Sequence, residues 1–166
     1  MRIAIILPCI LIAVAALGVA ESAAGLSWTA PAGWTSKGTA PMRAATYPVG
    51  DAECVVYFFG QGQGGSVEAN MTRWKGQFTV NGQPAPAKTA TKTLNGLTAS
   101  TLDVTGVYEG MGGPTMSPLA PKSDYRMVAA IVEGPGGNIF VKFTGPVKTV
   151  TANVAKYEQL LNSIHK

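Results

Sequence analysis

The feature that most constrains the fold is the dipeptide Asn95-Gly96, which stands between two runs of β-prone residues, 89–94 and 97–108. Asn-Gly is a preferred centre for a two-residue hairpin turn, because both residues tolerate the positive φ angles that this turn requires. The second run is rich in threonine and alternates in polarity, as a half-exposed strand does. The sequence therefore predicts a β-hairpin in the middle of the chain.

Further β-prone runs lie on both sides of this hairpin. The run 53–59 is apolar on both faces, which indicates a strand in the interior of a sheet. Glycine and proline interrupt the chain after most of the runs, as turns require. The other predicted strands are 26–30, 42–48, 125–133 and 139–144.

Two segments have the periodicity of amphipathic helices. Ser66 is a good N-cap for the first helix, and Glu68 lies in its first turn. One face of that helix carries Val67, Met71, Trp74 and Phe78, and the second helix, 151–164, has a similar apolar face. The predicted order is β-β-β-α-β-β-β-β-α, an α+β fold with a largely antiparallel sheet covered by two helices.

The chain begins with the pattern of a secretory signal peptide. Arg2 precedes an apolar run, 3–20, which small residues follow. Cleavage is expected after Ala24, with Ala20 as the competing position, so residues 1–24 form the signal and residues 25–166 a single domain. We expect an exported protein, periplasmic or extracellular. An uncleaved anchor helix is the alternative, and it would be the chain's one contact with a membrane.

Composition excludes several classes of function. The 166 residues include one histidine, next to the C-terminus, and two cysteines, which leaves little for histidine-dependent catalysis or Cys/His metal clusters. The 13 basic residues exceed the nine acidic ones by four and are scattered, which disfavours nucleic-acid binding. We therefore expect no enzymatic activity, no cofactor and no metal site.

Two side chains carry more than one interpretation. Cys54 lies in an apolar strand with no basic neighbour in the sequence, which favours a buried core thiol over a reactive one. Arg73 lies off the apolar face of the first helix, where it could pair with an acidic strand residue or hold a ligand. The ion pair is the favoured interpretation.

The segment 110–122 is long and rich in glycine and proline, which is typical of a functional loop. Two methionines in it would present adaptable apolar contacts, and the prolines would limit the entropy lost on binding. The predicted partner-binding surface comprises Met111, Gly112, Gly113, Pro114 and Met116.

The segment from Trp28 to Trp34 and the ending 141–150, which leads into the last helix, resemble exported bacterial proteins of unknown function. Their fold is similar to that of PsbP, the extrinsic subunit of photosystem II, and of the Ran-binding nuclear import factor. The resemblance implies an antiparallel sheet sandwiched by helices over residues 25–166. It also implies a non-enzymatic accessory protein that docks on a larger assembly.

The sequence thus favours a monomeric module that binds an envelope protein. A carrier of a small ligand or lipid, with a cleft between sheet and helix, is the first alternative. A hydrolase or lyase that uses carboxylates without histidine is the second. A carrier requires an apolar pocket of several hundred Å³, as small-ligand sites generally do. An enzyme of this kind requires two carboxylates that converge in a cleft.

Overall fold

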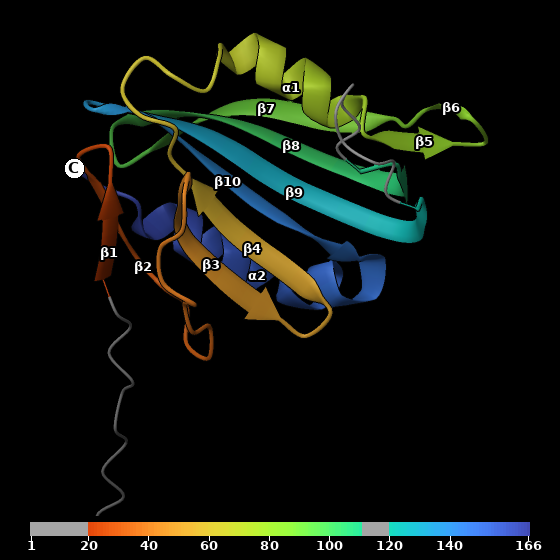
Figure 1. Ribbon diagram of the computed structural model, residues 1–166, viewed down its shortest axis with the longest axis horizontal. Helices are drawn as coiled ribbons and strands as arrows, with labels where there is room; N and C mark the ends of the chain where they lie inside the picture. Colours follow the sequence, from red (N-terminus) through yellow and green to blue (C-terminus); the bar gives the residue numbers. More distant parts are fainter. Residues whose placement is uncertain (1–19, 111–119) are drawn as a thin grey trace, which may run out of the picture.

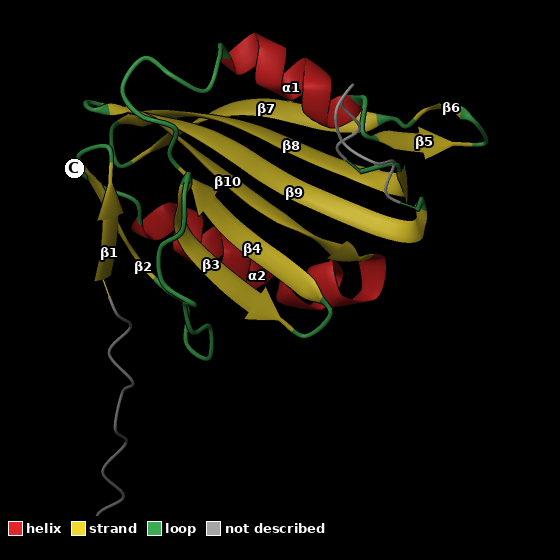
Figure 2. Cartoon of the chain, in the orientation of Figure 1, coloured by secondary structure: helices red, strands yellow, loops and turns green. Residues whose placement is uncertain are grey.

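The computed structural model describes residues 20–110 and 120–166, which form twelve elements (Figures 1 and 2). The strands are β1 (Ala20–Ala23), β2 (Leu26–Thr29), β3 (Arg43–Val49), β4 (Ala52–Tyr57), β5 (Phe78–Val80), β6 (Gln83–Pro84), β7 (Ala87–Leu94), β8 (Leu97–Tyr108), β9 (Lys122–Gly134) and β10 (Gly137–Pro146). The helices are α1 (Val67–Lys75) and α2 (Val147–Ser163).

An antiparallel sheet of eight strands forms the centre of the molecule. Its strand order is β3-β4-β10-β9-β8-β5-β6, and β7 pairs with β8 beside that path. Helix α1 lies over one face of the sheet and α2 over the other, and β1 with β2 forms a separate hairpin (Figure 1). The predicted α+β fold, with a largely antiparallel sheet between two helices, is confirmed.

The sheet separates two cores because strand side chains point alternately to its two faces. In β10, Ile139, Val141 and Phe143 join the core beneath α2, whereas Phe140 joins the core beneath α1. Lys142 is two residues from Phe140, so it also lies on the α1 face. This register places a cation among aromatic side chains.

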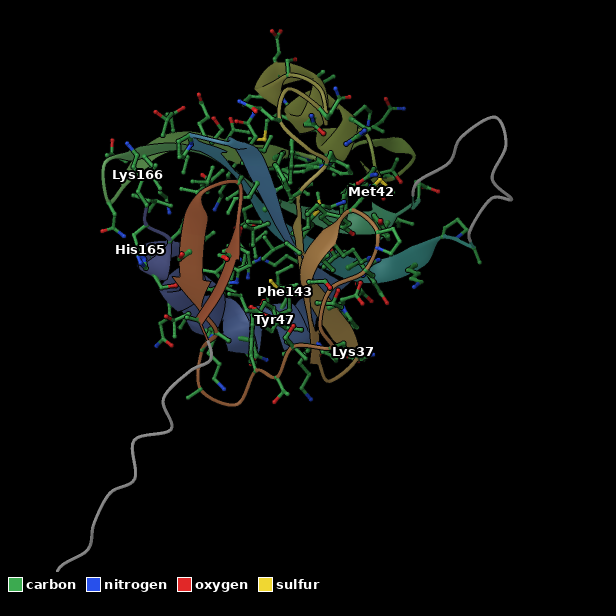
Figure 3. All side chains as sticks on the ribbon, turned by 60° about the vertical axis from the view of Figure 1, so that its left-hand side comes forward. Lys37, Met42, Tyr47, Phe143, His165 and Lys166 are labelled. Carbon is green, nitrogen blue, oxygen red and sulfur yellow. The ribbon has the colours of Figure 1, made fainter. Side chains whose placement is uncertain are left out.

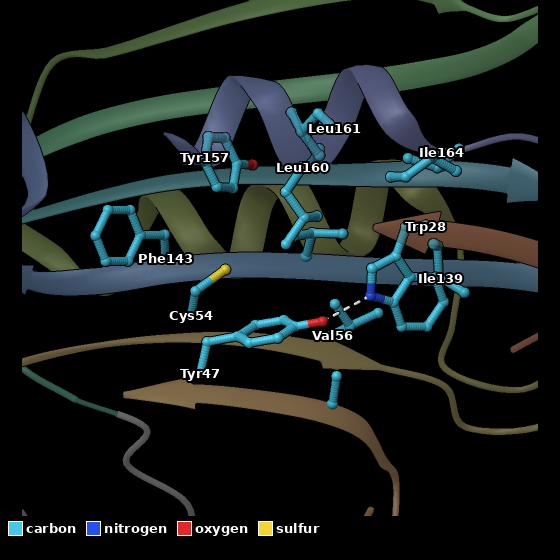
Figure 4. Packing of buried hydrophobic residues seen from close by; sticks show 14 of the residues in the cluster. Trp28, Tyr47, Cys54, Val56, Ile139, Phe143, Tyr157, Leu160, Leu161 and Ile164 are labelled. Atoms are coloured by element: carbon cyan, nitrogen blue, oxygen red, sulfur yellow. Dashed lines mark hydrogen bonds between the residues drawn. The ribbon is translucent and has the colours of Figure 1, made fainter. Parts of the chain in front are cut away.

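The core beneath α2 contains both tryptophans of the segment from Trp28 to Trp34. Trp28 and Trp34 are buried, and the indole Nε1 of Trp28 donates a hydrogen bond of 2.8 Å to the hydroxyl of Tyr47 (Figure 4). Cys54 is fully buried in the same core, and burial raises the pKa of its thiol well above the usual range. The prediction of an inert core thiol is confirmed.

The predicted hairpin is the pair β7 and β8. Asn95 and Gly96 form its turn with φ angles of 48° and 79°, the left-handed conformation that Asn-Gly favours. Eight residue pairs follow in regular antiparallel register, from Leu94 opposite Leu97 to Ala87 opposite Val104.

The structure differs from the sequence prediction at the end of the first helix. Helix α1 ends at Lys75, and Phe78 begins strand β5, where it lies opposite Tyr108. Phe78 still packs in the same core as Met71 and Trp74. The apolar spacing therefore identified the correct core residues, although the chain had already left the helix.

Two regions bear on the predicted domain limits and partner surface. Residues 20–23, assigned to the signal segment, form strand β1 and pair with β2. The predicted partner surface at Met111, Gly112, Gly113, Pro114 and Met116 lies outside the described residues.

Within residues 20–110 and 120–166, no helix is long and apolar enough to cross a membrane.

Candidate functional site

A cleft of about 310 Å³ lies between α1, the loop before β3 and the sheet; we name it the α1 cleft. Its lining residues are Pro41, Met42, Arg43, Tyr57, Phe59, Asn70, Arg73, Trp74, Phe140 and Lys142. Met42 is 61% exposed and stands at the rim, on the side of the molecule nearest α1 (Figure 3). The cleft therefore combines an exposed apolar side chain at its rim with the buried rings of Trp74 and Phe140 in its lining.

Lys142 is the central polar group of the α1 cleft. Its side chain extends from β10, a strand in the interior of the sheet, and its Nζ lies 5.5 Å from the centre of the Trp74 ring. Its one hydrogen-bond partner among the described residues is the amide Oε1 of Gln77, at 3.4 Å. Burial, with a smaller contribution from the nearby charge of Arg73, lowers the pKa of Lys142 to about 8.

Arg73 is held in place by Asn70, one helical turn earlier on α1. The buried Asn70 amide nitrogen donates to the carbonyls of Gly64 and Ser66, at 2.7 and 2.9 Å. Its side-chain oxygen accepts a hydrogen bond from the Arg73 guanidinium. The first two bonds orient Asn70, and Asn70 in turn orients Arg73, so this cation is positioned before any ligand arrives.

The start of α1 depends on local chemistry that the sequence indicates. The hydroxyl of Ser66 accepts a hydrogen bond of 3.1 Å from the backbone N–H of Ala69, which confirms the predicted N-cap. Gly64, at φ +89°, approaches the rings of Phe59 and Phe140 so closely that a Cβ would stand under 3.0 Å from both. Only glycine allows the loop to reach the aromatic wall here.

Aromatic rings form the wall of the α1 cleft. The ring centres of Phe59 and Phe140 are 5.2 Å apart, and those of Trp74 and Phe140 are 6.4 Å apart, both in edge-to-face contact. Tyr57 stacks on Phe59 at 5.9 Å. These contacts suit aromatic rings, which prefer offset or perpendicular packing.

Arg43 contributes a third cation from β3. Its guanidinium forms a salt bridge of 3.0 Å with Glu53 and lies 5.4 Å from the centre of the Tyr57 ring. Because Glu53 neutralises Arg43, two of the three cations that line the α1 cleft, Arg73 and Lys142, have no carboxylate partner among the described residues.

A second hollow, of about 480 Å³, continues from the α1 cleft across the part of the sheet that α1 leaves open. Lys142, Arg43 and Tyr57 line both hollows. The stacked rings of Tyr108 and Tyr125 stand on the far side, with Lys122 over Tyr125. Lys142 can therefore be reached from two directions.

The described lining of the α1 cleft thus has three cations, six aromatic or apolar side chains and no carboxylate. Taking an ammonium out of water has a free-energy cost that a nearby anion offsets. A guanidinium that is already oriented can accept two oxygens of a carboxylate, sulfonate or phosphate in parallel. The arrangement can hold an anionic group, with an apolar or aromatic body against the rings.

The sequence prediction of an ion pair for Arg73 is wrong. The described residues include all nine acidic side chains of the sequence, and none of them pairs with Arg73. Sequence reasoning did not identify Lys142 or Asn70 as site residues. The available signal was a lysine between two apolar residues of a strand, which marks a cation that is hard to solvate fully.

The fold belongs to the PsbP-like class. One matching solved structure is the solution structure of cyanobacterial PsbP (CyanoP) from Synechocystis sp. PCC 6803, with a TM-score of 0.55 and 15% sequence identity. The match covers 96% of this chain and 98% of that chain. No protein-family model and no curated protein matches the sequence. The likeness is one of fold, and it confirms the predicted PsbP-like architecture.

Proposed function

We propose that this chain is a binding module that takes the anionic group of a small amphiphilic or aromatic ligand into the α1 cleft. The observation that carries the proposal is Lys142, a mostly buried cation with no carboxylate partner among the described residues. A bound anion would supply the missing partner and restore the charged state of the ammonium.

The size and composition of the α1 cleft support a ligand-binding role. Its volume of about 310 Å³ is at the lower end of the range of small-molecule sites, which combine apolar walls with a few oriented polar groups. The carrier interpretation required a cleft of this kind between sheet and helix. An enzyme that uses carboxylates would need its active site elsewhere, because the described lining of the α1 cleft contains no carboxylate.

The PsbP-like fold supports the broader proposal of an accessory, non-enzymatic role. Export to the periplasm or the extracellular space is part of the same proposal, and it depends on the apolar run 3–20. An envelope protein as a further partner, through the surface at Met111 and Met116, also stays a prediction.

The test uses two fluorescent probes of similar shape and different charge. Anilinonaphthalene sulfonate carries an anion on an aromatic body, and N-phenylnaphthylamine is its uncharged counterpart. We expect the sulfonate to bind the wild-type protein in the α1 cleft. The Lys142→Met variant should bind it at least about tenfold more weakly, since a charge-assisted hydrogen bond contributes about 1.5–3 kcal/mol and every 1.4 kcal/mol is about tenfold.

Two controls separate the cleft from general surface binding. Lys75→Met removes an exposed cation from α1 that does not line the cleft, and it should leave the affinity for the sulfonate unchanged. The uncharged probe should bind the wild type and Lys142→Met with similar affinity. Equal loss of sulfonate binding in the Lys75 and Lys142 variants would contradict the proposal.

A further inference from the structure

The amine of Lys142 has the surroundings of a nucleophile rather than of a structural cation. It has no carboxylate partner among the described residues, it faces the Trp74 ring, and Arg73 lines the same cleft. It also lines the hollow on the open part of the sheet. A small molecule can therefore reach Nζ while its anionic group lies near the guanidinium.

These surroundings favour the neutral form of the amine. An amine becomes nucleophilic when an apolar pocket or a second cation makes protonation less favourable, and both conditions hold here. With a pKa of about 8, roughly 10% of Lys142 is free amine at pH 7, against less than about 0.1% for an ordinary exposed lysine. The buried amine thus exceeds exposed lysines about a hundredfold in its reactive fraction.

We propose that Lys142 forms an imine with the carbonyl carbon of an aldehyde or ketone that carries an anionic group. This inference rests on the proposed anion-binding role of the α1 cleft. The lone pair of Nζ attacks the carbonyl carbon, and a C=N bond replaces the C=O bond. The carbonyl oxygen leaves as water with the two protons of the amine, so the condensation needs no oxidant or reductant.

The positions of the other cleft residues match this step. Arg73, fixed by Asn70, would hold the anionic group, which raises the local concentration of the carbonyl compound. The rings of Trp74 and Phe140 exclude water from the side of the amine that they cover, and water would hydrolyse the imine. The reaction therefore selects for carbonyl compounds that carry an anionic group.

The test probe is glyoxylate, the smallest aldehyde with a carboxylate. The folded protein is incubated with glyoxylate and sodium cyanoborohydride at pH 7, and the labelled lysines are located by peptide mass spectrometry. The hydride converts the C=N bond to a stable secondary amine, which leaves one carboxymethyl group on the modified nitrogen. We expect Lys142 to carry at least about tenfold more label than any other lysine, as its free-amine fraction requires.

Matched variants assign the label to the site. Lys142→Arg keeps a cation but has no nucleophilic amine, so the dominant label should be lost. Arg73→Gln should lower the ratio of glyoxylate labelling to acetaldehyde labelling at Lys142, because acetaldehyde carries no anion for Arg73 to hold. Lys75→Arg should change neither. The N-terminal amine is counted separately, since its pKa is also near 8.

The outcomes separate this inference from the proposed function. If the sulfonate probe binds through Lys142 but glyoxylate labels all lysines alike, anion binding stands and imine formation is overturned. If glyoxylate and acetaldehyde label Lys142 equally well, the required anionic group is overturned. If Lys142 neither binds the sulfonate nor carries more label than exposed lysines, both proposals fail.

Discussion

The Lys142→Met variant is expected to be more stable than the wild-type protein at pH 7, by about 2 kcal/mol in the free energy of unfolding. Moving the pKa of Lys142 from 10.5 to about 8 on folding corresponds to roughly 3 kcal/mol, at about 1.4 kcal/mol per pKa unit. Methionine is similar in length and apolar, so it fills the same space without a charge. Loss of the bond to Gln77 offsets part of the gain.

The stability difference should shrink as the pH rises. Native Lys142 releases its proton near pH 8, whereas the unfolded chain keeps it up to about pH 10.5. Between these values the unfolded state binds more protons, so the wild type gains stability relative to the variant. Burial raises the pKa values of Cys54 and Tyr157 in both proteins, and the difference between the two curves cancels their effect.

Urea unfolding of both proteins at pH 6.5, 8 and 9.5 measures this difference. A stabilised variant at pH 6.5 that approaches the wild type at pH 9.5 is the expected pattern. A variant that is less stable than the wild type at every pH would show that Lys142 contributes more through its contacts than its burial costs. The expected gain in stability when Lys142 is replaced by methionine is typical of polar residues that are retained for function.

A chain that begins at Gly25 is expected to be less stable than one that begins at Ala20, by about 2 kcal/mol. The shorter chain lacks β1, whose Glu21 carboxylate accepts a hydrogen bond from the hydroxyl of Tyr47. Tyr47 is fully buried, so its donor would lose that partner, at a cost of about 1–3 kcal/mol. The midpoint of thermal unfolding should fall by roughly 6 °C.

Single substitutions isolate this hydrogen bond from the rest of β1. In the longer chain, Glu21→Ala should reproduce about half of the loss, while Glu21→Gln should retain most of the stability, because the amide oxygen still accepts from Tyr47. Equal stability of the two chain lengths would show that β1 adds nothing to the domain. The N-terminal residue of the protein isolated from its host, read by mass spectrometry, then tests cleavage after Ala20 against the predicted cleavage after Ala24.

Much of the fold could be predicted because the relevant signals are local. Asn95 and Gly96 adopt the turn from their own conformational preferences, and Ser66 caps α1 through a bond to Ala69. The end of α1 was less predictable. Phe78 continues the apolar spacing of a helix, but it packs in the same core from strand β5, and spacing alone does not distinguish the two.

The candidate site was predicted only in part. Arg73 was correctly placed off the apolar face of its helix, yet the expected acidic partner is absent among the described residues. Lys142 was placed correctly in a strand, but its environment depends on how far α1 extends across the sheet. A strand sequence identifies which residues share a face, and it does not show what covers that face.

The sequence by itself therefore determined seven of the strands, the hairpin turn, the start of α1 and the two apolar faces of the sheet, since each depends on residues close together in the chain. It did not predict strands β1, β5 and β6. Only the tertiary structure decided that Arg43 of β3, Arg73 of α1 and Lys142 of β10 line one cleft. Sheet order and the position of α1 bring them together, through contacts between residues that are distant in sequence. The electrostatic interactions within the cleft depend on the distances between these side chains, and no local sequence pattern specifies those distances.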